Sequence, residues 1–184
     1  LYLGLDQFKL LQNKLLINEL RLYGGKVNLS LDQKEGRSNF AFIEDYFAAD
    51  QPSKSSTDFQ VQLAELSMAH IAFSYHDLRK DTLDFGVDFD HIELKNLSLK
   101  ATQIQSVGES FKCQIRQLQF KERSGFVLTN LKAEAAYSDK GLVLRNATLQ
   151  TPKSAVSIPK LALRTQKSTD FNYFDDRVIF DGVL

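Results

Sequence analysis

Several features that commonly reveal a function are missing from this chain of 184 residues. It has no tryptophan and a single cysteine, so an internal disulfide is excluded. Lysine plus arginine and aspartate plus glutamate number 23 each, so the net charge is zero and an overall basic footprint for nucleic acid is absent. No apolar run is long enough for a transmembrane helix, and no signal peptide is recognisable. The aromatic residues are mainly phenylalanine, which favours burial over contacts with sugars or a membrane interface.

Residue patterns that carry catalysis are also absent from the sequence. There is no Gly-x-Ser-x-Gly elbow and no glycine-rich phosphate loop. The histidines, His70, His76 and His91, have no partner residues at the spacing of a zinc site. Cys113 shares its parity with apolar neighbours, which predicts a small buried side chain rather than a nucleophile. We therefore expect no catalytic residue, no metal and no cofactor, and a protein that is not an enzyme.

One acidic cluster allows two interpretations. Asp84, Asp88 and Asp90 recur at even spacing, and three aligned carboxylates could bind Ca²⁺. The alternative is a solvated sheet face that resists aggregation, and we favour it. In this interpretation Thr82–Phe89 is a strand with strict alternation, in which Leu83, Phe85, Val87 and Phe89 face inward and Asp84 and Asp88 face outward.

The most informative feature present is a six-residue pattern, Φ-x-x-Φ-x-Φ with Φ apolar, that occurs seven times. The copies begin at Ile17, Leu63, Leu94, Ile115, Leu128, Leu144 and Ile158. Apolar alternation marks a half-buried strand, but here it skips two residues and resumes on the opposite parity. A β-bulge or bend at the skip would restore one apolar face. The repeats predict an all-β fold: an elongated, curved antiparallel sheet, shaped like a taco, with an apolar groove.

The remaining segments complete this expected architecture. Gly24-Gly25 predicts a tight hairpin, with Lys26–Leu31 as the returning strand. One short helix is expected near residues 39–47, where Phe40, Ile43 and Phe47 share a face and would form a plug or lid at one end of the groove. The expected organisation is a first β unit with the helix at 1–49, a flexible linker at 50–58, and the main groove segment at 59–184. Both ends lie within alternating patterns, so we expect one continuous domain within a longer protein.

Five segments of the sequence resemble the AsmA/TamB-like superfamily of bacterial envelope proteins. Leu16–Leu29 is similar to the repeated unit of strand, small-residue turn and strand in that family, and Leu63–Tyr75 resembles a second such unit. Gly36–Ile43 resembles its Gly-x-x-Asn-aromatic segment, which starts a short helix. Residues 124–128 and 149–154 look like segments of the TamB-like proteins of Bacteroidetes in particular. The resemblance implies a long β-groove exposed to the periplasm, an inner-membrane anchor in the full-length protein, and phospholipid movement between membranes during outer-membrane biogenesis.

Two functions follow as hypotheses. In the first, the groove binds or conducts phospholipid acyl chains, and its interior is lined by the apolar residues after each skip. These residues are Leu20, Leu22, Leu66, Met68, Leu97, Leu99, Leu118, Phe120, Leu131, Leu149, Leu161 and Leu163. In the second, the sheet is a structural scaffold of the cell envelope whose open edges bind a partner such as an outer-membrane assembly protein. We expect no nucleic-acid partner in either case.

Overall fold

A single nine-stranded β-sheet contains almost all of the chain that the structure places. The computed structural model describes residues 2–9, 14–41, 60–108, 110–165 and 179–183. The strands are β1 (Tyr2–Lys9), β2 (Lys14–Leu31), β3 (Gln60–Asp77), β4 (His91–Val107), β5 (Ser110–Glu122), β6 (Val127–Ser138), β7 (Gly141–Gln150), β8 (Ala155–Arg164) and β9 (Ile179–Val183). The all-β prediction is confirmed.

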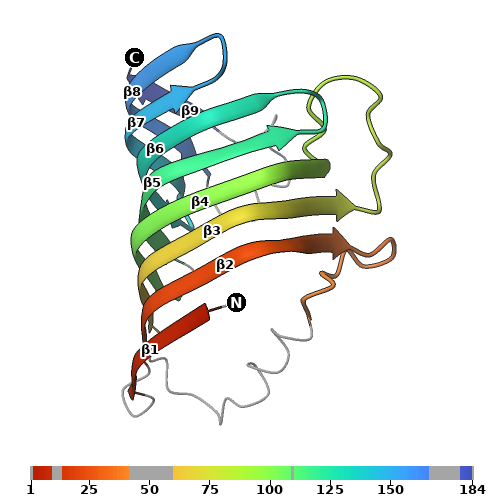
Figure 1. Cartoon of the computed structure of the whole chain (residues 1–184). Coiled ribbons are helices and arrows are strands. Elements are labelled where there is room, and N and C mark those ends of the chain that lie inside the picture. The colour runs from red at the N-terminus through yellow and green to blue at the C-terminus, as the bar shows by residue number, and fades with distance from the viewer. Residues whose placement is uncertain (1, 10–13, 42–59, 109, 166–178, 184) are drawn as a thin grey trace.

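The strands follow one another through the sheet in sequence order, from β1 to β9. Figure 1 shows the long strands crossing the front of the molecule and turning back behind it, so the sheet is curved and open. Neighbouring strands are antiparallel with one exception, since β2 and β3 run parallel. The prediction of a wholly antiparallel sheet is therefore wrong at this pair. A parallel pair needs a long crossover connection, and the chain between Leu31 and Gln60 provides it.

The hairpin predicted at Gly24-Gly25 is also wrong, because β2 continues through both glycines. Gly24 has a φ of 63° and lies between the register pairs Tyr23–Ala69 and Gly25–Ile71. His70, with a φ of 55°, occupies the same interval on β3. Both strands therefore bend together and stay in register. The glycine conformation that would serve a tight turn serves here as a bend within one strand.

The predicted bulges exist at most of the skips in the repeated pattern. The register shifts between neighbouring strands at the copies that begin at Ile17, Leu94, Ile115, Leu128 and Leu144. At the copies that begin at Leu63 and Ile158 the register is regular. Two of the bulges place the second skipped residue in the left-handed region, with φ values of 53° at Asn96 and 50° at Asn146. Asparagine is among the few side chains that tolerate this conformation.

A substitution at Asn96 tests this explanation of the bulge. Asn96 is exposed, so its side chain contributes little by burial. Asn96→Val should lower the free energy of unfolding by about 1–2 kcal/mol, because a β-branched residue is strained at this φ. Asn96→Gly should be close to wild type, and urea denaturation measures both. The control is Lys95→Val, next to it on the same exposed stretch; if it costs as much as Asn96→Val, backbone strain is not the reason for the asparagine.

The buried core is thin, as expected of one sheet. Leu63, Ala101, Ile104 and Cys113 form its buried centre, and half-buried apolar residues of the neighbouring strands pack around them. Cys113 is buried as predicted, and burial raises the pKa of its thiol. The helix prediction lies mostly outside the described residues, as does the linker at 50–58; Phe40 is exposed, and Ile43 and Phe47 are not among the described residues.

The largest disagreement with the sequence concerns the segment between β3 and β4. Residues 78–90 form a loop and not a strand. The apolar residues predicted to face inward, Leu83, Phe85, Val87 and Phe89, are all exposed, whereas Asp88 is only 2% exposed. Burial does not alternate here, since Asp84 and Asp90 are exposed as well. The segment is a loop because the buried carboxylate of Asp88 binds backbone N–H groups that a strand would have paired elsewhere.

Candidate functional site: an apolar trough

A continuous row of apolar residues crosses seven strands of the sheet. Each member is the register partner of the next, in the order Leu22, Met68, Leu99, Leu118, Leu131, Leu149 and Val156. Six of these seven residues were predicted to line the groove. With neighbouring strands about 4.8 Å apart, the six intervals span roughly 29 Å. The hydrocarbon half of a bilayer is about 15 Å thick, so one acyl chain fits along the row.

Other predicted lining residues lie in shorter rows beside this one. Leu20 and Leu66 begin a row that continues with Ala101, Ile115 and Ala133. The remaining pairs are Leu97 with Ile71, Phe120 with Leu128, Leu161 with Leu144, and Leu163 with Leu142. Each predicted lining residue thus has an apolar register partner. We call the surface formed by these rows the apolar trough.

The sequence prediction omitted the apolar residues that precede each skip. Ile115, Leu128 and Leu144 pair directly with predicted lining residues or continue their rows. Because the bulge shifts the register by one residue, apolar positions on both sides of the skip reach the same face. The two-residue skip itself was the signal that these positions belong to the trough.

The predicted lining residues of the trough are half-buried, whereas their partners Ile71, Ala101, Leu128 and Ala133 are buried. All twelve predicted lining residues fall in this intermediate class. On the opposite parity, Lys95 pairs with Lys121, and Lys132 pairs with Thr148. The three lysines are exposed, and two like charges in register are tolerated only where water screens them. At these positions of β4 to β6 the sheet therefore has one apolar and one solvated face, and the half-buried apolar residues remain accessible.

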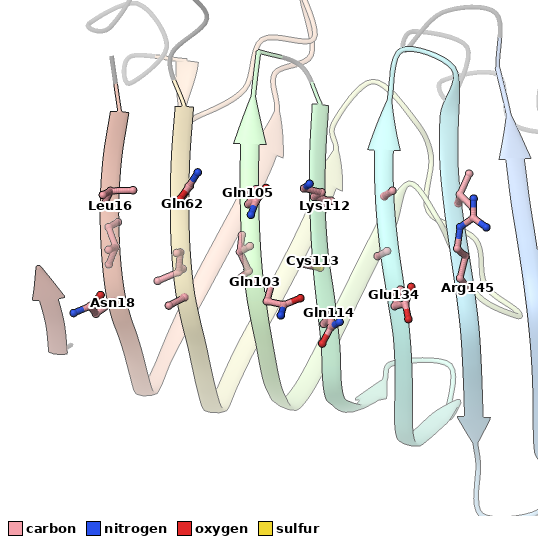
Figure 2. A pocket seen from close by; sticks show the side chains of 17 residues that line it. Leu16, Asn18, Gln62, Gln103, Gln105, Lys112, Cys113, Gln114, Glu134 and Arg145 are labelled. Carbon is pink, nitrogen blue, oxygen red and sulfur yellow. The ribbon is translucent and has the colours of Figure 1, made fainter. Parts of the chain in front are cut away.

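A hollow of about 800 Å³ lies across strands β2 to β7 near one of their ends. The residues that line it lie near the starts of β2, β3, β5 and β7 and near the ends of β4 and β6. Figure 2 shows side chains of these adjacent strands around it. Its apolar lining includes Ile17, Leu63, Ile104 and Cys113. Amide and charged side chains complete the lining of the hollow. They are Gln62, Gln103, Gln105, Gln114, Lys112, Glu134 and Arg145. The Oε1 atom of Gln114 is buried and accepts no hydrogen bond from the described residues. The hollow has the size of a small-molecule site, with a mixed lining.

The base of the loop between β3 and β4 is fixed by hydrogen bonds to the buried carboxylate of Asp88, and we call this base the loop neck. Oδ1 of Asp88 accepts the N–H groups of Asp90 and His91, both at 3.1 Å. Oδ2 accepts the N–H of Leu83 at 2.8 Å and lies 3.1 Å from Nδ1 of His91. Burial raises the pKa of Asp88, but these hydrogen bonds and the nearby imidazole outweigh it and leave the pKa below its ordinary value. The carboxylate is therefore occupied by the chain itself.

An ion pair between Arg79 and Asp77 also stabilises the loop neck. Arg79 donates two hydrogen bonds to Asp77, from Nε at 2.8 Å and from Nη2 at 2.7 Å. This bidentate contact lowers the pKa of Asp77 to about 2. Arg123, in the β5–β6 turn, places Nη2 3.7 Å from Asp88 and Nη1 3.8 Å from Glu93. These charges hold the loop against the sheet.

The alternatives weighed for the acidic cluster and the histidines find no support among the described residues. There, no group of three histidine, cysteine or acidic side chains is arranged to hold a metal ion. The three aspartates do not form the solvated sheet face that we favoured, since they lie in a loop where Asp88 is buried while Asp84 and Asp90 are exposed. His76 and His91 have ring centroids 5.7 Å apart, and His70 packs edge-on against Tyr23.

Comparison with known proteins assigns no family to the chain. No family model, no curated protein and no solved structure matches it. Within the described residues, no helix has the length and apolar character needed to span a membrane.

Proposed function

We propose that the apolar trough binds phospholipid acyl chains and lets them move along it. The observation that carries the proposal is the row from Leu22 to Val156, which is continuous over seven strands, half-buried as far as Leu149 and exposed at Val156. Burial of a CH₂ group is worth about 0.8 kcal/mol, so an acyl chain gains about 10 kcal/mol in such a trough. Apolar contact is non-directional, so sliding along the row costs little.

The wider role is part of the same proposal. The segments that resemble AsmA/TamB-like proteins favour a periplasmic segment of an envelope protein anchored in the inner membrane, which moves phospholipid between the inner and outer membranes. A uniform apolar row suits a conduit, because a conduit requires continuity and no catalytic group. The exposed lysines of the opposite parity, Lys95, Lys121 and Lys132, would face water.

Photocrosslinking in cells tests the proposal. A photoreactive residue replaces Leu97, Leu118 or Leu161 in the trough. In the control variants it replaces Lys95 or Lys132, whose side chains have the opposite parity to the trough residues. We expect phospholipid adducts at the three leucines and none at the lysines, as read by mass spectrometry. Lipid adducts at all five positions, or at none, would contradict a lipid-lined trough.

A second candidate function rests on the open edges of the sheet. Among the described residues β1 pairs only with β2, and β9 pairs only with β8. An unpaired edge can accept a strand of another protein by β-augmentation. In that case the chain would be a scaffold for an outer-membrane assembly partner. Protein adducts without lipid in the same experiment would favour this candidate.

A further inference from the structure

The loop at residues 78–90 presents apolar side chains to solvent at its tip. Phe85 is 94% exposed, the highest value for a large apolar residue among the described residues, and Phe89 is 76% exposed. Leu83 is exposed as well, and Gly86 has a φ of 85°, which allows the tip to turn tightly. In Figure 1 the loop arches out beyond the ends of the strands. Contiguous exposed apolar residues of this kind mark an interaction site.

The exposure is imposed by the structure of the loop neck. Three backbone N–H groups bind Asp88, and the N–H of Asp77 donates to the carbonyl of Asp90 at 2.8 Å. The N–H of Leu78 donates to the carbonyl of Leu31 at 3.1 Å, which ties the loop to the end of β2. An ordered tip binds with a smaller loss of conformational entropy than a disordered one. The loop neck therefore keeps Phe85 and Phe89 exposed, in a position to enter an apolar medium.

The loop lies at the rim of the sheet next to a second exposed aromatic residue. Arg123 links the β5–β6 turn to Asp88, and the same turn carries Phe126, which is exposed. Both connections leave the sheet at the end where β3 and β5 finish. A surface that approached this rim would meet the apolar tip first and Phe126 beside it.

The charged residues around the tip determine which kind of membrane surface it can bind. From residue 80 to residue 90, the exposed charges are Lys80 and three aspartates, Asp81, Asp84 and Asp90. Arg79 is paired with Asp77 and adds no free positive charge. Carboxylates at the flanks repel an anionic membrane surface and attract the ammonium groups of zwitterionic headgroups.

We propose that the tip from Leu83 to Phe89 inserts into the surface of a bilayer rich in phospholipids with ammonium headgroups, such as phosphatidylethanolamine or phosphatidylcholine. Insertion by about 5–10 Å buries the tip while its aspartates stay among the headgroups. The proposal goes beyond the apolar trough and does not require lipid in it. It would place the rim of the trough against a source or acceptor of lipid.

Vesicle flotation tests the proposal with the whole chain. Wild type should float with phosphatidylcholine vesicles, and more weakly with an equimolar mixture of phosphatidylcholine and phosphatidylglycerol. Phe85→Ser should weaken binding about tenfold or more, because one phenylalanine side chain leaves the bilayer. The matched control is Tyr23→Ser, which removes a similarly exposed ring from the middle of β2 and should bind as wild type does. Circular dichroism checks that both variants are folded.

A fluorescent label gives a second measurement. Cys113 is buried, so an environment-sensitive dye reacts selectively with Phe85→Cys, and its emission should shift to the blue with phosphatidylcholine vesicles. Tyr23→Cys should show no shift. Absence of vesicle binding, equal binding of Phe85→Ser and wild type, or a preference for the anionic mixture would each overturn the proposal. Native mass spectrometry of Phe85→Ser separates the two proposals, because lost flotation with retained lipid supports membrane insertion independently of the trough.

Discussion

Leu118→Glu should abolish lipid binding while leaving the sheet folded. Leu118 lies at the centre of the long row, with Leu99 and Leu131 as its register partners. A carboxylate there would meet an acyl chain without a polar partner, and such burial costs several kcal/mol. Lipid affinity should therefore fall about a hundredfold or more. Because Leu118 is only half-buried, the free energy of unfolding should fall by just about 1–2 kcal/mol.

Native mass spectrometry of the purified protein measures the bound phospholipid, and urea denaturation measures stability. The control is Lys132→Glu, which changes the charge on the opposite parity of the neighbouring strand and should retain lipid. Leu118→Gln, which is uncharged, serves if the glutamate variant does not fold. If Leu118→Glu retained as much lipid as Lys132→Glu, the trough would not be the lipid site.

The repeated pattern predicted the fold because it encodes a local constraint and a global one together. Alternation specifies a strand, and the two-residue skip specifies a bulge if the apolar face is to stay continuous. Asn96 and Asn146 show the physical basis, since both adopt the left-handed conformation that the bulge requires. All copies therefore contribute to one face, although two copies achieve this with a regular register.

The direction of β3 relative to β2 could not be predicted from local patterns. A glycine pair before an apolar run is typical of a hairpin, and the same residues also permit a bend within a strand. The two outcomes differ in which strand pairs with β2 along Lys26–Leu31. The structure pairs this segment with Ala72–Asp77, far along the sequence. Only long-range pairing selects between them, and no short motif reports it.

The loop was misassigned as a strand because apolar alternation does not exclude a turn in which a side chain binds the backbone. Phe85 and Asp88 lie on opposite parities, and the general preference for buried apolar residues favoured Phe85. The backbone N–H groups of the turn reverse that preference, since a carboxylate that accepts three of them is stabilised when buried. A phenylalanine that remains in solvent under these conditions is a candidate for binding.

Removing the buried carboxylate of the loop neck should have the second largest effect. Asp88→Ala leaves the N–H groups of Leu83 and Asp90 without their acceptor, and that of His91 keeps only the backbone carbonyl of residue 88, at 3.2 Å. The free energy of unfolding at neutral pH should fall by about 3 kcal/mol. Amide hydrogen exchange should show faster exchange at these three residues, because the loop opens locally. Urea denaturation with a spectroscopic probe measures the global loss.

The pH dependence of this loss follows from the sign of the pKa shift. The pKa of Asp88 lies below its ordinary value of 3.8, so the carboxylate stabilises the folded state above that pH. Wild type should lose this contribution as the pH falls below about 4 and through the folded pKa. The difference between wild type and Asp88→Ala should therefore shrink in acid. The control is Asp84→Ala, an exposed aspartate of the same loop, which should change stability by less than about 0.5 kcal/mol at any pH. Equal losses for the two variants would mean that the neck does not depend on Asp88.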